Sequence, residues 1–283
     1  MAQLRPVDGT DYYLWKFLPS VLAAVIFIIL FTIVTGILCW RTVKTRSWFC
    51  IPFALGGLFQ IIGYGVRVFA HYRTDLIAPY TVQSCFILLA PVLYTASVYM
   101  VLGRLIRSVH GERFSIVRPA KMTKLFVLAD FLSLNVQGNG AGLTVKKKTE
   151  TVGKYIVVVG LFIQLIAFGW FVVVALVFHV RMQKNVDKEC RLRPTVPWRQ
   201  GLRMIYICSA LIMLRSIFRV VEYVMGVDSY LLTNEWPMYV FDAAPMWIVQ
   251  AAFLVWFPDR FKPGQYDNIE DGHVLAGNES AMQ

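Results

Sequence analysis

The chain has 283 residues, of which 57% are hydrophobic and 16% charged, and its mean hydropathy is +0.57. This apolar share excludes an ordinary soluble domain and predicts an integral membrane protein. The formal net charge of +11 does not indicate nucleic acid, because the Lys and Arg residues lie mainly in short segments between apolar runs. We expect no nucleic-acid partner, and anionic lipid head groups as the counter-charge of these basic segments.

Seven apolar segments are long enough to span a membrane, which takes about 20 residues each. The predicted fold is therefore all-α: a polytopic membrane protein with a bundle of seven transmembrane helices. The fourth segment is the least apolar, and hydropathy alone scores it as marginal. In chain order the segments are Phe17 to Trp40, Trp48 to Ala70, Tyr80 to Gly103, Met122 to Gly142, Tyr155 to His179, Gly201 to Met225 and Trp236 to Phe257.

The Lys and Arg residues between these segments predict the orientation of the chain. With the N-terminus outside, the inner segments hold sixteen of them and the outer segments seven. We therefore expect an extracellular N-terminus and a cytosolic C-terminus, and only the run Lys146 to Lys148 is discordant. The expected domains are an extracellular segment 1–16, a transmembrane domain 17–257 and a disordered cytosolic tail 258–283, which has too few apolar residues to build a core.

The sequence shows no pattern typical of an enzyme or of a metal site. The five cysteines have no metal-ligand spacing, so we infer neither a disulfide framework nor zinc. The stretch Gly138 to Gly142 is no phosphate loop, because no strand precedes it and no helix start follows. It is better interpreted as a helix end or a site of close helix packing. We expect no catalytic residues, no metal and no cofactor.

Polar and charged side chains recur inside the expected spans, where a charge costs roughly 2.5 to 3.5 kcal/mol even on a lenient insertion scale. On the second, fourth and sixth spans their spacing places them on one helix face. Three arginines and three carboxylates make the set neutral, as pairing inside a bundle requires. These candidate site residues are Gln60, Tyr64, Arg67, Asp130, Ser133, Gln137, Arg215, Arg219, Glu222 and Asp242.

Two interpretations of this polar set remain open. Interhelical polar contacts tie helices together and fix their register. Alternatively, the residues line a polar cavity or substrate path, which is the default for ionisable groups in a membrane. We favour the substrate path, although Arg67 and Glu222 lie near span boundaries, where long side chains reach the interface.

Several motifs in a fixed order resemble the fungal lipid-translocating exporter family, also called RTA-like, over nearly all seven spans. The resemblance implies seven transmembrane helices, a place in the plasma membrane or an internal membrane, and transport of sphingoid long-chain bases, toxic sterols or phospholipids, which gives resistance to toxic lipids. One branch of the family is associated with porphyrin and heme traffic. The motifs are Tyr80-x-x-Gln83-Ser84, Leu88 to Pro91, Tyr99-Met100-x-Leu102-Gly103-Arg104, Gly111-Glu112-Arg113, Asp130-x-x-Ser133-x-x-x-Gln137-Gly138, Arg215-x-x-x-Arg219-x-x-Glu222-Tyr223 and Tyr239-x-Phe241-Asp242.

A lipid with a cationic amine needs an anionic partner inside the membrane. We expect a carboxylate among Asp130, Glu222 and Asp242 to receive the amine, while the arginines keep these carboxylates charged or receive a phosphate. The alternative is a seven-helix receptor that senses lipid or membrane stress. Against it, the third span ends in Gly-Arg-Leu-Ile-Arg in place of an acidic-arginine-tyrosine motif. A lipid hydrolase is the least favoured alternative, since no nucleophile elbow is present.

Overall fold

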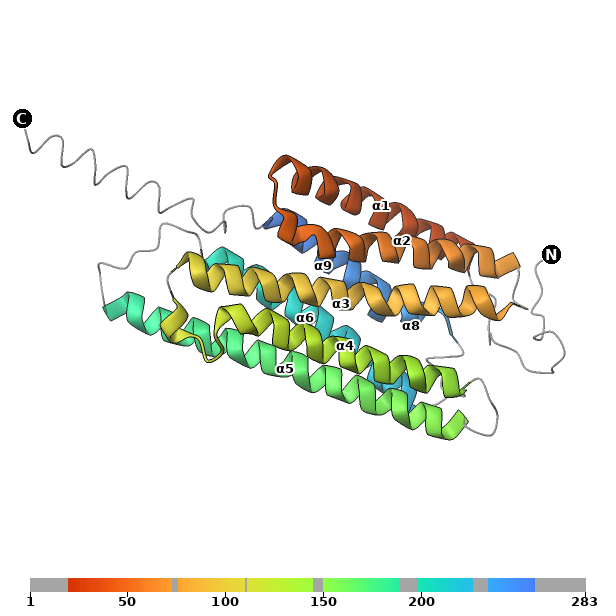
Figure 1. Ribbon diagram of the computed structural model, residues 1–283. Helices are drawn as coiled ribbons and strands as arrows, with labels where there is room; N and C mark the ends of the chain where they lie inside the picture. Colours follow the sequence, from red (N-terminus) through yellow and green to blue (C-terminus); the bar gives the residue numbers. More distant parts are fainter. Residues whose placement is uncertain are drawn as a thin grey trace, which may run out of the picture.

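The structure is a computed structural model of the chain and describes residues 20–72, 76–109, 111–144, 150–188, 198–225 and 234–257. The expected segments 1–16 and 258–283 lie outside the described residues. Every regular element within the described ranges is helical (Figure 1), so the predicted all-α class is confirmed there.

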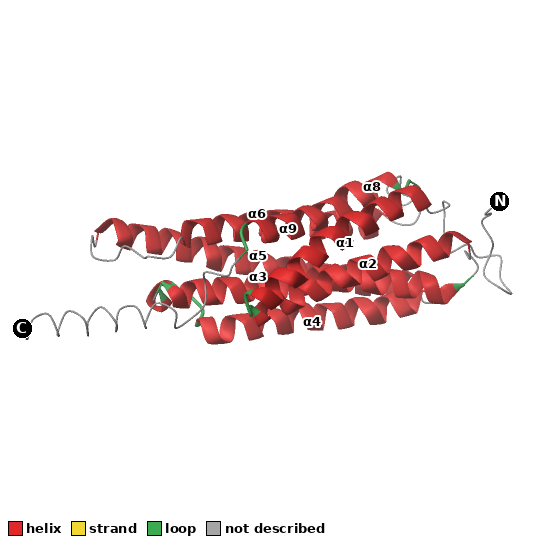
Figure 2. Cartoon of the chain, turned by 90° about the horizontal axis from the view of Figure 1, so that it is seen from above, coloured by secondary structure: helices red, strands yellow, loops and turns green. Residues whose placement is uncertain are grey.

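Seven long helical segments make up most of the described chain, and their axes run close to parallel in both ribbon views (Figures 1 and 2). Two short 3₁₀-helices, η1 (Trp48–Cys50) and η2 (Glu112–Phe114), precede the second and the fourth segment. The long segments are α1 (Val21–Lys44), α2 (Ile51–Tyr72), α3 (Ile77–Ser108), α4 (Pro119–Thr144), α5 (Glu150–Lys188), α6 (Trp198–Met225) and the continuous run of α8 (Trp236–Met238), η3 (Tyr239–Ala243) and α9 (Ala244–Val255).

Six of these segments are long and apolar enough to cross a membrane, and the exception is α4. A helix satisfies all its interior backbone groups internally, which is why apolar sequences of this length fold as helices in lipid. The protein is thus a multi-pass membrane protein. Within the described ranges the apolar spans number one fewer than the seven predicted from the sequence.

The first five helices pack against their neighbours in chain order, and the last helix returns to pack against the first. α2 packs against α1 and α3, and α4 packs against α3 and α5. α6 contacts α3, α5 and α9, while α9 returns to α1, and in Figure 1 α6 and α9 lie behind α2, α3 and α4. Aromatic stacking supports this closure: the rings of Phe53 on α2 and Phe253 on α9 have centroids 3.9 Å apart.

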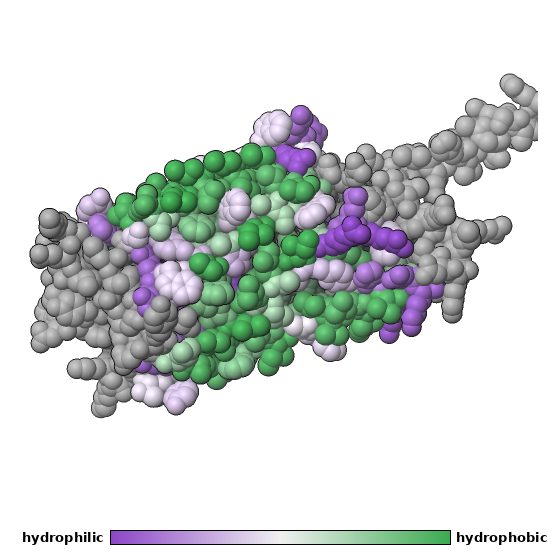
Figure 3. All heavy atoms as spheres, turned by 180° about the vertical axis from the view of Figure 1, so that it is seen from behind, coloured by the Kyte–Doolittle hydropathy of each residue, from purple (hydrophilic) through white to green (hydrophobic). Residues whose placement is uncertain are grey.

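The outer surface of the bundle is apolar. Leu22 on α1 and Ile166 on α5 are 74% and 70% exposed. The face drawn in Figure 3 is largely hydrophobic along the middle, and its hydrophilic residues gather mainly toward the ends. Such a surface matches the acyl chains of a bilayer, which are as apolar as leucine.

One end of the bundle carries most of the described basic residues outside the helix interiors. The turns from α1 to α2 and from α3 to α4 lie at this end, together with the end of α9 (Figure 1). Here Arg41 Nη1 donates a hydrogen bond to the Leu254 carbonyl at 2.6 Å, which satisfies a carbonyl at the end of α9. We call this the basic end and define it by Arg41, Lys44, Arg104, Arg107, Arg113, Arg118, Lys121, Arg181, Lys184 and Arg199.

Candidate functional site

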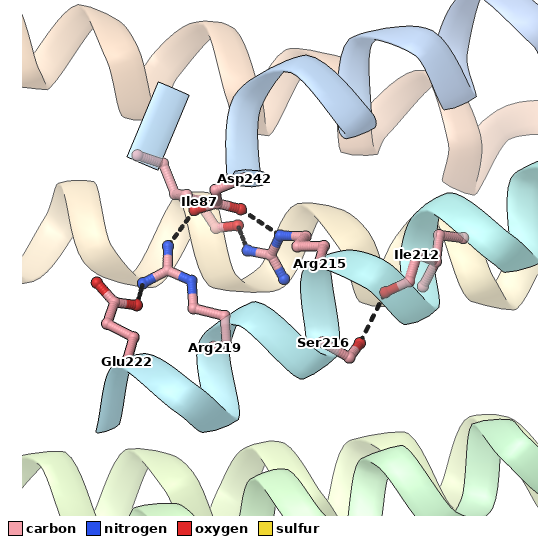
Figure 4. A network of polar contacts seen from close by, with 7 residues as sticks. All are labelled: Ile87, Ile212, Arg215, Ser216, Arg219, Glu222 and Asp242. Carbon is pink, nitrogen blue, oxygen red and sulfur yellow. Dashed lines mark hydrogen bonds and ion pairs between the residues drawn. The ribbon is translucent and has the colours of Figure 1, made fainter. Parts of the chain in front are cut away.

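Four charged side chains form a network between α6 and the last helical run (Figure 4). Arg215 Nε and Arg219 Nη2 both donate to the carboxylate of Asp242, one to each oxygen. Arg219 Nη1 also donates to Glu222 Oε2 at 3.0 Å, and Arg215 Nη2 donates to the Ile87 carbonyl of α3 at 3.1 Å. We call Arg215, Arg219, Glu222 and Asp242 the α6 charge network, and its formal charge is zero.

The local backbone explains how these groups meet. Arg215, Arg219 and Glu222 stand at i, i+4 and i+7 on α6, so they share one helix face. Asp242 lies in the π-helical turn η3, directly before the proline-containing start of α9. Pro245 has no N–H to donate to the preceding turn, and single π-helical turns are frequent at functional sites.

Burial within the α6 charge network is graded. The side chain of Asp242 is 1% exposed and that of Arg215 6%, whereas Arg219 and Glu222 are 15% and 11% exposed. Charges removed from water must be paired, because an isolated buried ion costs several kcal/mol. Asp242 therefore pairs with both arginines in the interior, and Glu222, held by Arg219 nearer the edge, supplies the second negative charge.

A second ion pair joins α2 to the start of the last helical run. Arg67 Nη2 lies 2.7 Å from Glu235 Oε1, and its Nε lies 3.2 Å from both this oxygen and the Tyr239 hydroxyl. The Tyr239 hydroxyl donates to the same Glu235 oxygen at 3.1 Å, while the Ser20 backbone N–H donates to Oε2 at 2.8 Å. We call this the Arg67–Glu235 pair.

Asp130 lies apart from both sets, at mid-length of α4. Its Oδ2 is 2.9 Å from Thr95 Oγ1 and 3.0 Å from the Tyr99 hydroxyl of α3. No lysine, arginine or histidine of the described ranges forms an ion pair with it. The carboxylate that completes the neutral set with the three arginines is therefore Glu235, and Asp130 takes no part in it.

The other predicted polar residues of α4 join it to α5. Ser133 Oγ donates to the Gly160 carbonyl at 2.5 Å. Gln137 Nε2 donates to Ser133 Oγ and to Gln164 Oε1, both at 2.9 Å. These bonds form a polar seam between α4 and α5.

Gln60 and Tyr64 of α2 are fully buried, at 1% and 0% exposure. Within the described part of the chain, Gln60 Oε1 and the Tyr64 hydroxyl have no hydrogen-bond partner. The Tyr64 ring stacks on Phe27 of α1 and on Tyr239, with centroids 5.9 Å and 6.1 Å apart. Tyr64 thus lies where α1, α2 and η3 meet, next to the Arg67–Glu235 pair.

The candidate site residues predicted from the sequence did not include Glu235, Tyr239, Thr95 and Tyr99, although Tyr99 and Tyr239 stand in the motifs of the family resemblance. Glu235 immediately precedes the seventh expected span and therefore lies outside the residues expected at membrane depth. Its spacing held a signal, because it lies four residues before Tyr239 and seven before Asp242 on one helical face. The Thr95 hydroxyl gave no such signal, since threonine is common in apolar helices.

The arrangement suits the binding of small charged groups. Carboxylates accept charge-assisted hydrogen bonds from an ammonium group, and guanidinium groups bind phosphate or carboxylate. Over the described residues no group of three or more His, Cys, Asp or Glu side chains is placed to hold a metal ion.

The chain is similar to a family of known proteins and to several yeast membrane proteins. The family described as "RTA1 like protein" matches residues 53–265. Protoporphyrin uptake protein 1 of Saccharomyces cerevisiae is 30% identical over 304 residues, covering 94% of this chain and 98% of that protein. Protein RTA1 of the same yeast is 33% identical, covering 74% and 65%. Its sphingoid long-chain base transporter RSB1 is 24% identical, covering 97% and 81%. No solved structure matches the chain significantly.

Proposed function

Since the chain belongs to the RTA1-like protein family, we propose that it translocates amphipathic lipids bearing a cationic amine across the membrane. Sphingoid long-chain bases are the first cargo proposed, because a relative named as their transporter aligns with 97% of the chain. A porphyrin is the second, because a relative named as a protoporphyrin uptake protein aligns with 94%. The α6 charge network supports the lipid cargo, because its carboxylates can bind a cationic amine.

The observation that carries the proposal is the position of Glu222. It lies at the edge of the α6 charge network, and among the described residues Arg219 is its cationic partner. Arg219 also holds Asp242, so it keeps a carboxylate partner when Glu222 turns away. Glu222 can therefore exchange one cation for another without leaving a buried charge unpaired.

The mechanism we propose is an exchange of partners at Glu222. The ammonium group of the lipid takes the place of Arg219 Nη1 and donates to the carboxylate, while the apolar chain stays in contact with lipid. The surface one turn from Glu222 suits that chain, since Met225, three residues further along α6, is 56% exposed. When the amine leaves, Arg219 returns, and the protein is ready for another lipid.

The test compares wild-type protein with Glu222→Gln in liposomes that contain a labelled sphingoid base. We expect the variant to move the lipid at least about tenfold more slowly, equivalent to about 1.4 kcal/mol, because the amide cannot pair with the amine. Leaflet distribution of the label is the measurement. Glu112→Gln, which makes the same change at an exposed residue of η2, is the control and should move lipid at the wild-type rate.

Two outcomes would contradict the proposal. Equal rates for wild type and Glu222→Gln would remove Glu222 from the path. No lipid movement by folded wild-type protein would favour the alternative function, a seven-helix sensor of lipid or membrane stress, in which the same charges fix the helix packing.

We also propose that α4 is a seventh membrane span. Its 26 residues give a length of about 39 Å at 1.5 Å per residue, more than the roughly 30 Å of the hydrocarbon core. Asn135 Nδ2 and Asn139 Nδ2 each donate to the carbonyl four residues earlier, at 2.8 Å. The inward Ser133 and Gln137 bond to α5. The donor groups of these four side chains therefore have partners inside the protein, which lowers the cost of placing them in lipid.

Single-cysteine labelling tests this topology, in a chain whose five native cysteines are replaced by alanine. Glu112→Cys before α4 and Thr151→Cys after it are both exposed positions. If α4 spans the membrane, a membrane-impermeant maleimide should label Thr151→Cys from outside and Glu112→Cys only after permeabilisation. Labelling of both from one side would show that α4 does not cross.

The orientation we propose places the basic end in the cytosol and the N-terminus outside. The excess of Lys and Arg at the basic end favours this direction of insertion. Guanidinium and ammonium groups at this end would then lie against the anionic head groups of the inner leaflet, to which each contributes about 1 kcal/mol.

A further inference from the structure

Asp130 is a buried carboxyl group that neither the charged networks nor the proposed lipid path uses. It is 1% exposed, and its Oδ1 has no hydrogen-bond partner within the described ranges. An ionised carboxylate buried without a cation is very costly, whereas a neutral carboxylic acid tolerates one bare carbonyl oxygen far better. The surroundings of Asp130 therefore suit the neutral form.

The hydroxyl of Thr95 is placed to serve both forms of the carboxyl group. Thr95 Oγ1 lies 2.9 Å from Asp130 Oδ2 and 2.8 Å from the Val92 carbonyl, yet it has a single hydrogen. With Asp130 ionised, this hydrogen points to Oδ2. With a proton on Oδ2, the acid donates to Thr95 Oγ1 and the threonine hydrogen turns to Val92. The Tyr99 hydroxyl donates to Oδ2 in both cases.

The side chains around Asp130 are packed so closely that a proton fits there and a larger cation does not. Tyr99 is 0% exposed, and its ring packs against Phe126, Phe168 and Phe171 with centroids 5.4, 6.2 and 4.5 Å away. Among the described side chains around Asp130, the titratable group is the Tyr99 phenol of α3, and aromatic rings of α4 and α5 pack against that phenol. An ammonium group on an apolar chain would have to displace these rings, whereas a proton needs no cavity.

We propose that Asp130 is a proton-binding site in the transmembrane domain, with the Thr95 hydroxyl as its switch. The proton comes from water, bonds to Oδ2 and returns to water when the site is hydrated in another conformation. Lipid movement coupled to this proton is the further consequence, and that step rests on the function proposed above.

Infrared difference spectra of the protein in lipid nanodiscs, recorded over about pH 4 to 10, test proton binding without any substrate. We expect wild type to show the carbonyl band of a protonated carboxyl in apolar surroundings, with an amplitude that changes with pH. Asp130→Asn should lose this band and take up about one proton fewer per chain on acidification. Glu112→Gln should keep the band.

Tyr99→Phe provides a second variant that retains the carboxyl group. It removes one hydrogen bond to Oδ2, so the band should remain and shift in frequency. A wild-type spectrum in which no pH-dependent band depends on Asp130 would overturn the proposed site, whatever the outcome of the lipid assay.

The coupling is tested in the liposome assay with and without an imposed pH gradient. We expect the gradient to change the wild-type rate several-fold, and Asp130→Asn to give one rate in both conditions. Identical wild-type rates with and without the gradient would overturn the coupling. A pH-dependent Asp130 band in protein that moves no lipid would support the proton site and contradict the proposed lipid function, so the two failures are distinguishable.

Discussion

Replacing Asp242 with asparagine should destabilise the protein by about 3 to 5 kcal/mol and abolish lipid movement. Asp242 is 1% exposed and is the shared partner of Arg215 and Arg219. Asparagine would leave the two guanidinium groups close together inside the bundle, with Glu222 as the remaining carboxylate of the network. Thermal unfolding of purified protein in nanodiscs is the measurement.

Glu222→Gln is the matched comparison for this prediction. It also removes one negative charge from the α6 charge network, but Arg219 retains Asp242. We therefore expect a much smaller loss of stability from Glu222→Gln than from Asp242→Asn, although both should lose lipid movement. Equal destabilisation by the two variants would contradict the expectation that Asp242, the more buried carboxylate, contributes more to stability than Glu222.

A double variant separates the structural role of the charges from their role in transport. Arg215→Gln combined with Asp242→Asn leaves Arg219 and Glu222, which is again a neutral set. We expect most of the stability lost in Asp242→Asn to return, because removing both partners of a buried pair costs far less than removing one. Recovery of stability without lipid movement would place the charges on the transport path, and recovery of both would make their role purely structural.

Gly140→Ala should destabilise the packing of α4 on α5 by about 1 to 3 kcal/mol. A methyl group at this position would lie 2.9 Å from the Gly153 carbonyl oxygen and 2.9 Å from the Val157 nitrogen. Both are backbone atoms of α5, so the two helices would have to move apart. Thermal unfolding in nanodiscs measures the effect.

Gly138→Ala and Gly142→Ala are the controls for this prediction. Each lies on the same stretch of α4, and a methyl group there would meet no atom of the described residues within 4 Å. We expect these changes to be neutral or to stabilise the helix, since alanine is favoured over glycine in helices by about 1 kcal/mol. Destabilisation by all three changes alike would contradict a specific close approach at Gly140.

The helix α4 illustrates the limit of hydropathy. It was predicted from length and pattern, and the structure has a helix of 26 residues there. Polar side chains lower its hydropathy below that of the six helices that are apolar enough to cross a membrane. What hydropathy does not register is that Asn135 and Asn139 bond to their own helix and Ser133 and Gln137 to α5 or to each other. The polarity of the sequence therefore overstates the polarity that the helix presents to its surroundings.

The sequence by itself determined the helical class and the local geometry of α6, because both follow from periodicity within one segment. The spacing of Arg215, Arg219 and Glu222 places them on one face wherever the helix lies. Tertiary structure decided which charges meet. Arg67 pairs with Glu235 because α2 meets the last helical run, where the rings of Phe53 and Phe253 stack, and Asp130 lies among hydroxyl groups and aromatic rings because α4 packs between α3 and α5. Pairing across helices depends on which helices are neighbours, and residue spacing within each helix does not contain that information.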